Sequence, residues 1–145
     1  MVRLDDGEEV RLTGYADRLE LDSEGNVVVV DLKTGRTVPV DRDVPRDPQL
    51  GVYQLAVRDG AFAERHPGPP GGAELVQLRR EVRGSVKVQS QPAMAAGDEW
   101  CADLVGATAT SIRAERFDAR PNDGCDRCPF RTSCPAHPSG GQVVS

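Results

Sequence analysis

The sequence predicts an α/β domain in which helices flank a mixed central β-sheet. Two strand-like stretches joined by a glycine-containing loop come first, and a stretch with helical spacing follows them. Two further strands and a second helix complete the order β-β-α-β-β-α, which is typical of this class. The length of 145 residues suits a single domain.

The first two strands are expected over residues 8–22 and 26–33, which are rich in Val, Leu and other strand-forming residues. Ser23-Glu24-Gly25 separates them, and glycine suits the left-handed last position of a three-residue hairpin loop. The next stretch, residues 36–48, is broken by prolines, so we expect it to be a loop.

The first helix is expected over residues 48–59, where apolar residues recur at nearly helical spacing and a proline suits the first turn. Residues 66–72, with the sequence HPGPPGG, read as a flexible loop, and residues 73–79 and 85–91 as two more strands. A second helix is expected over residues 97–115, with an apolar stripe formed by Trp100, Leu104, Ala107, Ser111 and Ile112.

Charged residues gather where the second strand ends. With the loop above, Asp17 faces Asp31 and Tyr15 faces Lys33, all on one face of the hairpin. Two opposed carboxylates repel each other, and Mg²⁺ resolves the conflict because it binds carboxylates together with phosphate oxygens and water. Lys33 could then orient a water or neutralise a phosphate. The same residues also suit a solvated strand end with a surface ion pair.

Charge and hydropathy restrict the class of protein. The formal net charge of -5 argues against a broadly basic nucleic-acid coat, although it leaves room for a local basic groove. No apolar run approaches the ~20 residues needed to span a bilayer. The N-terminus has no apolar signal region, so a cytoplasmic protein without a membrane partner is expected.

Three cysteines near the C-terminus follow the pattern C-x2-C-x5-C at Cys125, Cys128 and Cys134. In a cytoplasmic protein, cysteines at this spacing indicate a structural metal site more than disulfides. The fourth ligand stays open. His137 would complete a Cys3His zinc set, and Cys101 is available too, although it suits a buried structural thiol better.

Four short motifs occur in order along the chain: GYADRLE at 14–20, VVDLKTG at 29–35, QLGVY at 49–53 and CDRCPFRTSC at 125–134. Together they resemble the RecB-type branch of the PD-(D/E)XK nuclease superfamily, and the similarity covers nearly the whole chain. The resemblance is closest to the C-terminal nuclease domain of actinobacterial RecB/AdnA-type helicase-nucleases, which carry a UvrD-like motor. It implies a restriction-endonuclease-like fold and an Mg²⁺- or Mn²⁺-dependent DNA nuclease of exonuclease type.

The resemblance also implies roles for individual residues. It assigns catalytic roles to Asp17, Asp31, Lys33, Gln49 and Tyr53, and metal ligation to Asp17, Asp31 and the backbone carbonyl of Leu32. Lys33 would be the catalytic lysine, and Gln49 and Tyr53 would flank the site from one face of the helix. Without the family context, Gln49 and Tyr53 read as ordinary helix residues.

In nucleases of this kind, a helix with a metal-binding His and one cysteine of a [4Fe–4S] cluster precede the first strand. Neither feature precedes the first strand here, and His66 in the Gly/Pro loop reads as solvated. We therefore expect a part of a larger protein. Residues 1–119 would form a nuclease core truncated at its N-terminal side, residues 120–137 a Cys-rich metal-binding segment and residues 138–145 a flexible tail.

The resemblance implies partners and a cellular process as well. Cys125, Cys128 and Cys134 would hold a [4Fe–4S] cluster in the intact protein, with Zn²⁺ as the alternative. A helicase motor in the same chain would feed single-stranded DNA to the nuclease during double-strand break repair and end resection, with a second helicase-nuclease subunit. The alternative function is a non-catalytic module of the same fold that docks DNA or a subunit.

Overall fold

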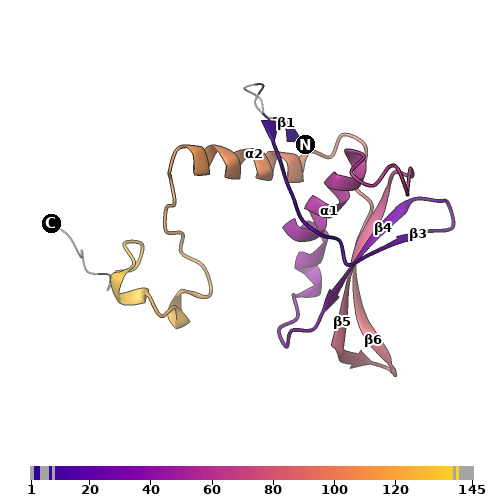
Figure 1. The fold of residues 1–145 in the computed structure, drawn as a ribbon. Coiled ribbons are helices and arrows are strands. Elements are labelled where there is room, and N and C mark those ends of the chain that lie inside the picture. The colour runs from indigo at the N-terminus through magenta and orange to yellow at the C-terminus, as the bar shows by residue number, and fades with distance from the viewer. Residues whose placement is uncertain (1, 4–6, 8, 139, 141–145) are drawn as a thin grey trace. The chain divides into compact units, whose positions relative to one another are not determined.

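The protein is described by a computed structural model that covers residues 2–3, 7, 9–138 and 140. It divides into two compact units, residues 1–107 and residues 108–145. The first unit contains a four-stranded sheet with the order β3-β4-β5-β6 (Figure 1). Its strands are β3 (Arg18–Leu21), β4 (Val27–Lys33), β5 (Pro70–Val82) and β6 (Ser85–Gln91).

The sheet is mixed, as predicted. β4 and β5 run parallel, whereas β3–β4 and β5–β6 are antiparallel pairs. Helix α1 (Pro48–Arg58) lies in the crossover between β4 and β5 and packs on the sheet, and α2 (Trp100–Arg113) follows β6. Both helices and all four strands occur in the predicted order, which confirms the α/β class.

Several shorter elements complete the chain. They are β1 (Val2–Arg3), β2 (Glu9–Val10) and the 3-10 turns η1 (Asp41–Arg46), η2 (Cys125–Arg127) and η3 (Arg131–Ser133). β1 and β2 pair with each other in a separate two-stranded sheet. No helix in the described part of the chain is long and apolar enough to cross a membrane.

The β3–β4 hairpin has the predicted register. Leu19 pairs with Val29 and Leu21 with Val27, and Gly25 takes the left-handed conformation at φ 83°. The predicted first strand was too long, however. The ladder begins only at Arg18, because the Asp17 carboxylate accepts the Leu32 amide that the next backbone bond would use. Residues 11–17 are therefore irregular, and residue 8 lies outside the described ranges.

Strand β5 is longer than predicted at both ends. Residues 70–72, expected to be loop, begin the strand instead, and the Val27 amide donates to the Pro69 carbonyl at 2.8 Å just before it. The glycine at 72 is required there, since it has φ 121° and a Cβ would lie 2.8 Å from the Gln91 carbonyl oxygen. At its other end β5 continues past its last pair with β4 and forms a long hairpin with β6 (Figure 1).

Helix α1 begins where the sequence predicts. Asp47 is the N-cap, its side chain accepts the Leu50 amide at 3.1 Å, and Pro48 occupies the first helical position. Residues 36–48, predicted to be a loop, contain the 3-10 turn η1 directly before this cap. The cap and η1 together fix where the first turn of α1 meets the sheet.

The main core lies between α1 and the sheet face formed by the odd-numbered residues of β4 and β5. Its buried members are Val27, Val29, Val44, Leu50, Val57, Ala73 and Leu75. Burying one such Val or Leu side chain contributes about 1.5–3 kcal/mol. This core fixes the face of β4 that α1 covers, and that face includes Asp31 and Lys33.

A second cluster joins α1 to the start of α2. It contains Leu55, Cys101 and Val105, with Trp100 packed against it. The predicted stripe of α2 was correct at Trp100 but wrong at Leu104 and Ile112, which are exposed, whereas Cys101 and Val105 are buried. Trp100 and Cys101 reach the backbone of α1 at Gly51, where the absence of a side chain allows the close approach.

Replacing Gly51 with alanine should destabilise the protein. A Cβ at this position would lie 2.5 Å from Cη2 of Trp100 and 3.0 Å from Sγ of Cys101. A contact this short lies at the upper end of the range of about 1–3 kcal/mol that overpacking costs, which outweighs the gain of about 1 kcal/mol in helix propensity. We expect urea denaturation to show a net loss of about 1–2 kcal/mol.

The matched control for this substitution is Gly14→Ala. A Cβ at Gly14 has no neighbour within 4 Å, so the free energy of unfolding should change by less than about 0.5 kcal/mol. A Gly51→Ala protein that is as stable as the Gly14→Ala protein would contradict the packing described for α1 and α2.

Candidate functional site

Four of the predicted site residues meet where β4 ends and α1 begins. Asp31 and Lys33 lie on the α1-facing side of β4, and Gln49 and Tyr53 lie one helical turn apart on α1. Asp31 is 4% exposed, whereas Gln49 is exposed to solvent. The register of the hairpin and the cap of α1 therefore bring together residues that are far apart in the sequence.

Gln49 links the other three side chains. Its Nε2 donates to Asp31 Oδ1 and to the Tyr53 hydroxyl, both at 3.1 Å, and its Oε1 accepts from Lys33 Nζ at 2.7 Å. The Tyr53 hydroxyl donates to Asp31 Oδ1 at 3.3 Å. Each polar group in this cluster is thereby oriented by at least one neighbour.

The two oxygens of Asp31 have different environments. Oδ1 accepts from Gln49 and Tyr53, whereas Oδ2 accepts no hydrogen bond from the described residues and lies 2.7 Å from Lys33 Nζ as an ion pair. The orientation of the two groups is not that of a hydrogen bond, so the contact is an ion pair only. A buried carboxylate needs a compensating cation, and Lys33 provides one.

Asp17 lies at the same end of β4 but not in the predicted arrangement. Its Oδ2 accepts the Leu32 amide at 2.9 Å, so it bonds to the backbone beside Asp31 instead of pairing with Asp31 across a ladder. The amide and carbonyl of one strand residue point to the same side, so the Leu32 carbonyl also faces Asp17. Tyr15, which was expected opposite Lys33, is 94% exposed and precedes the start of β3.

Two carboxylates and one carbonyl suit Mg²⁺ in donor chemistry. This ion commonly takes one or two protein carboxylates and completes its shell with water and phosphate oxygens. Asp31 Oδ2 is a buried oxygen that accepts no hydrogen bond from the described residues, and Asp17 is exposed. Within the ranges that the structure describes, no three His, Cys, Asp or Glu side chains converge as metal ligands.

Four buried glutamines, which the sequence pattern did not predict to be buried, form two hydrogen-bonded pairs near the site. They are Gln54, Gln77, Gln89 and Gln91. Gln91 Nε2 donates to the carbonyls of Val44 and Asp47 at 3.1 Å, and Gln54 Nε2 donates to Gln91 Oε1 at 2.8 Å. Gln91 thus holds the cap residue from which α1 starts.

The second glutamine pair joins β5 to β6. Gln77 Nε2 donates to Gln89 Oε1 at 3.0 Å, and Gln89 Nε2 donates to the Pro39 carbonyl and to Asp41. The Lys87 ammonium, 2.7 Å from Asp41, and Gln89 hold the pKa of the Asp41 carboxyl below its usual range. Polar side chains at alternate positions of β6, namely 87, 89 and 91, were the available signal.

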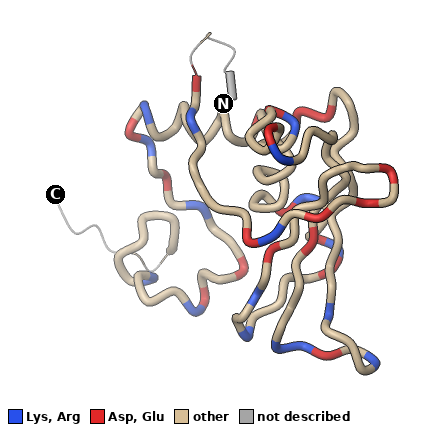
Figure 2. Tube along the Cα trace, turned by 45° about the vertical axis from the view of Figure 1, so that its right-hand side comes forward, with Lys and Arg blue, Asp and Glu red and all other residues tan. Residues whose placement is uncertain are grey.

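The described arginines of the first unit are interspersed with acidic residues along the chain, as the blue and red segments in Figure 2 show. Arg18 pairs with Glu20 at 2.8 Å and Arg46 with Asp98 at 3.5 Å, which reduces their net contribution to the surface potential. Arg79 and Arg80 on β5 are exposed, and Arg80 donates to the Arg36 carbonyl at 3.3 Å.

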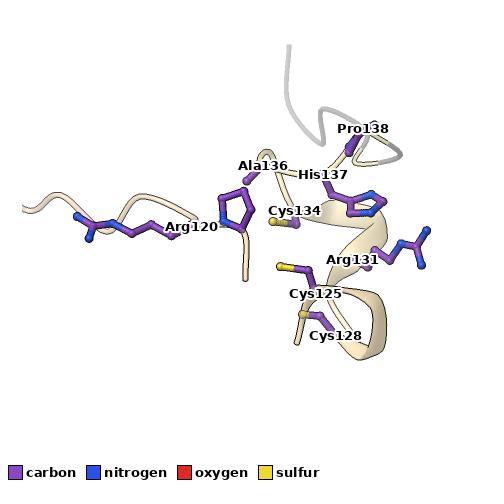
Figure 3. A pocket seen from close by; sticks show the side chains of 9 residues that line it. Arg120, Cys125, Cys128, Arg131, Cys134, Ala136, His137 and Pro138 are labelled. Atoms are coloured by element: carbon purple, nitrogen blue, oxygen red, sulfur yellow. The ribbon is translucent and has the colours of Figure 1, made fainter. Parts of the chain in front are cut away.

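In the second unit, Cys125, Cys128 and Cys134 line one cavity of about 170 Å³ with Arg131 and His137. Their sulfur atoms point to one side of the segment in Figure 3, and the His137 ring points away from them in this view. The backbone amide of Asn122 donates to Cys125 Sγ at 3.2 Å, a contact that suits a thiolate ligand. The donor set fits a thiolate-bound metal in chemistry.

Cys101 has a different environment from the other three cysteines. It is fully buried between α1 and α2, and burial raises the pKa of its thiol. The prediction of a buried thiol is confirmed. A protonated, buried thiol is a poor metal ligand and a poor nucleophile.

A thiol-specific disulfide reagent should therefore distinguish the cysteines in the reduced, metal-free protein. We expect Cys125, Cys128 and Cys134 to react rapidly, and Cys101 to react only when urea unfolds the protein. A Cys101→Ala variant should retain all of the rapid reaction. Rapid reaction of every cysteine in the folded wild type would contradict the burial of Cys101.

Comparisons with known proteins identify the family of the chain. An uncharacterized protein of Rickettsia conorii, RC0550, is 30% identical to this chain over 89 residues, which are 55% of this chain and 10% of that protein. The chain thus spans only about a tenth of that relative. The family model of the PD-(D/E)XK nuclease superfamily matches residues 2–135. With the mixed sheet and with Asp31 and Lys33 at the end of β4, this match shows that the chain belongs to the PD-(D/E)XK nuclease superfamily.

Proposed function

We propose that this chain is the Mg²⁺- or Mn²⁺-dependent DNA nuclease domain of a RecB/AdnA-like helicase-nuclease. It would act as an exonuclease on a single strand during double-strand break repair and end resection. The observation that carries the proposal is the contact of Asp31, Lys33, Gln49 and Tyr53 at one end of the sheet. Hydrolysis of a phosphodiester needs a ligand set for a metal and a nearby cation, and this cluster contains both.

Asp17, Asp31 and the Leu32 carbonyl would hold the metal, which supplies an activated water and neutralises a phosphate oxygen when it is bound. Gln49 and Tyr53 hold Asp31 by Oδ1, so Oδ2 is the oxygen available for ligation. Ligation there competes with the Lys33 ion pair. Lys33 would then turn from Asp31 to the phosphate, and Gln49 Oε1 would keep the ammonium oriented.

For the cysteine segment, we infer a structural [4Fe–4S] cluster in the intact protein, with Zn²⁺ as the alternative. The support is the cavity that Cys125, Cys128 and Cys134 share and the hydrogen bond that the Asn122 backbone amide donates to Cys125 Sγ. Protein purified without oxygen should be brown if a cluster is bound, and a Cys128→Ser variant should lose the colour. Colourless protein with one equivalent of zinc would refute the cluster for this chain.

The helicase context rests on two features. The order of the nuclease and cysteine motifs resembles the RecB-type branch, and the Rickettsia relative is much longer than its matching region. A motor in the same protein would feed the strand to the site, which explains how a domain of net charge -5 could act on DNA. A second helicase-nuclease subunit would be the further partner.

Degradation of end-labelled, linear single-stranded DNA tests the proposed function. We expect cleavage with Mn²⁺ or Mg²⁺ and none when EDTA removes the metal. DNA that is bound but not cut with either metal would contradict the nuclease proposal and support the non-catalytic docking module. DNA that is neither bound nor cut would contradict both.

A further inference from the structure

An open recess of about 510 Å³ lies on the first unit beside the candidate metal site. Residues on its two sides come from the segment leading into β3 and from the turn after α1. The lining includes Ala16, Leu19, Phe62, Glu64, Arg65 and His66. The volume falls within the range of small-molecule sites, about 300–1,000 Å³.

The recess is next to the candidate site along β3. Ala16 directly precedes Asp17, and Leu19 lies two residues beyond Asp17, which corresponds to about 7 Å along an extended strand. Ala16, Leu19 and Phe62 pack on the same core cluster as Tyr53, whose hydroxyl contacts Asp31. A chain molecule bound across Asp17 would therefore reach the recess with its next unit.

The residues around the recess suit a nucleotide. Ala16 and Leu19 provide apolar surface, and the half-buried Phe62 provides an aromatic ring on which a base can stack. The Arg65 guanidinium and the His66 imidazole make no hydrogen bond or ion pair with any residue in the described ranges. An arginine without a protein partner can bind a phosphate group through two parallel hydrogen bonds. Glu64 can accept a hydrogen bond from an exocyclic amine of a base.

We propose that this recess binds the nucleotide of a single DNA strand that neighbours the scissile phosphodiester. Phe62 stacks on the base, and Arg65 binds the phosphate that follows it. His66, which was expected to be solvated, is half-buried at the edge of the recess and contacts the same nucleotide. This inference rests on the proposed function for the identity of the strand, but binding in the recess does not require catalysis.

Binding of a fluorescent oligothymidylate in EDTA tests the recess at constant ionic strength. We expect Arg65→Gln to weaken binding about tenfold and Arg65→Lys to restore part of the loss, because one charge-assisted contact is removed or partly replaced. Phe62→Leu keeps an apolar side chain in the core and should also weaken binding, because stacking is lost.

The control is Arg83→Asn, which removes one positive charge from the turn at the far end of β5 and suits its left-handed φ of 53°. If Arg83→Asn and Arg65→Gln weaken oligonucleotide binding equally, the effect comes from the net charge of the protein alone, and the proposal would be overturned. Unchanged binding in both Arg65→Gln and Phe62→Leu would also overturn it.

A photoreactive 5-iodouracil oligonucleotide gives an independent readout. The cross-link should map to the peptide that contains Phe62 and His66 in the wild-type protein, and a cross-link that maps only to other peptides would contradict the recess. Failure of the proposed function is distinguishable from failure of this inference. Wild-type protein that never cuts DNA, but binds it through Phe62 and Arg65, would refute the nuclease and leave the recess supported.

Discussion

Lys33→Ala and Asp31→Ala should each lower the rate of DNA cleavage with Mn²⁺ by about 10²–10³-fold, the effect of removing one group that stabilises the transition state. Asp31 is the buried carboxylate of the candidate site, and Lys33 is the cation beside it. For Lys33→Ala the loss should fall mainly on kcat, because a group that acts only in the transition state contributes little to ground-state binding. For Asp31→Ala part of the loss should come from weaker metal binding.

The chain offers a matched control for the lysine, since Lys33 and Lys87 are its two lysines. Lys87 lies on the same face of the sheet, where its ammonium is paired with Asp41 at 2.7 Å. Lys87→Ala removes the same charge from a place outside the cluster and should keep most of the activity. Equal activity of wild type, Lys33→Ala and Asp31→Ala would contradict the catalytic interpretation.

Gln91→Leu should lower the free energy of unfolding by about 2–3 kcal/mol, because it removes three hydrogen bonds worth roughly 1 kcal/mol each: those donated to the carbonyls of Val44 and Asp47 and the one accepted from Gln54. Leucine has nearly the volume of glutamine, so loss of hydrogen bonds is the main effect. Urea denaturation measures the change. Ser90→Ala, on the opposite face of β6, is the control and should change stability by less than about 0.5 kcal/mol.

Gln91→Leu should also lower the activity indirectly, through the cap of α1. Asp47 caps α1, and Gln49 and Tyr53 lie in the first two turns of that helix. A looser cap should therefore lower kcat while the affinity for DNA stays within a few-fold. A Gln91→Leu protein with wild-type stability would contradict the hydrogen bonds described for Gln91, because the two carbonyls would then not depend on Gln91.

Local signals predicted the hairpin and α1 correctly. The three-residue loop with Gly25 determines the register of β3 and β4, and Pro48 after Asp47 determines the start of the helix. These features depend on residues close together in the sequence. The positions of Asp31 and Lys33 on the α1-facing side of β4 follow from them directly.

Tertiary contacts decided what the sequence could not predict. In β6, hydrophobic alternation alone would bury Val86 and Val88, yet Gln89 and Gln91 are buried at 5% and 3% exposure. Their amides are satisfied in the interior because they donate to carbonyls of residues 39–47, and these partners lie more than forty residues away. Asp17 likewise ends the ladder with its side chain, which no pattern within the first strand indicates.

Mn²⁺ binding measured by calorimetry in the absence of DNA tests the central claim most directly. If Asp17 and Asp31 hold the metal while Lys33 competes for Asp31 Oδ2, Asp31→Asn and Asp17→Asn should each weaken binding at least about tenfold. Lys33→Ala should bind Mn²⁺ as tightly as the wild type or more tightly, although it cleaves DNA more slowly, because a positive charge beside the ligand has been removed. Affinity that neither Asp substitution changes, or that Lys33→Ala weakens, would contradict this account.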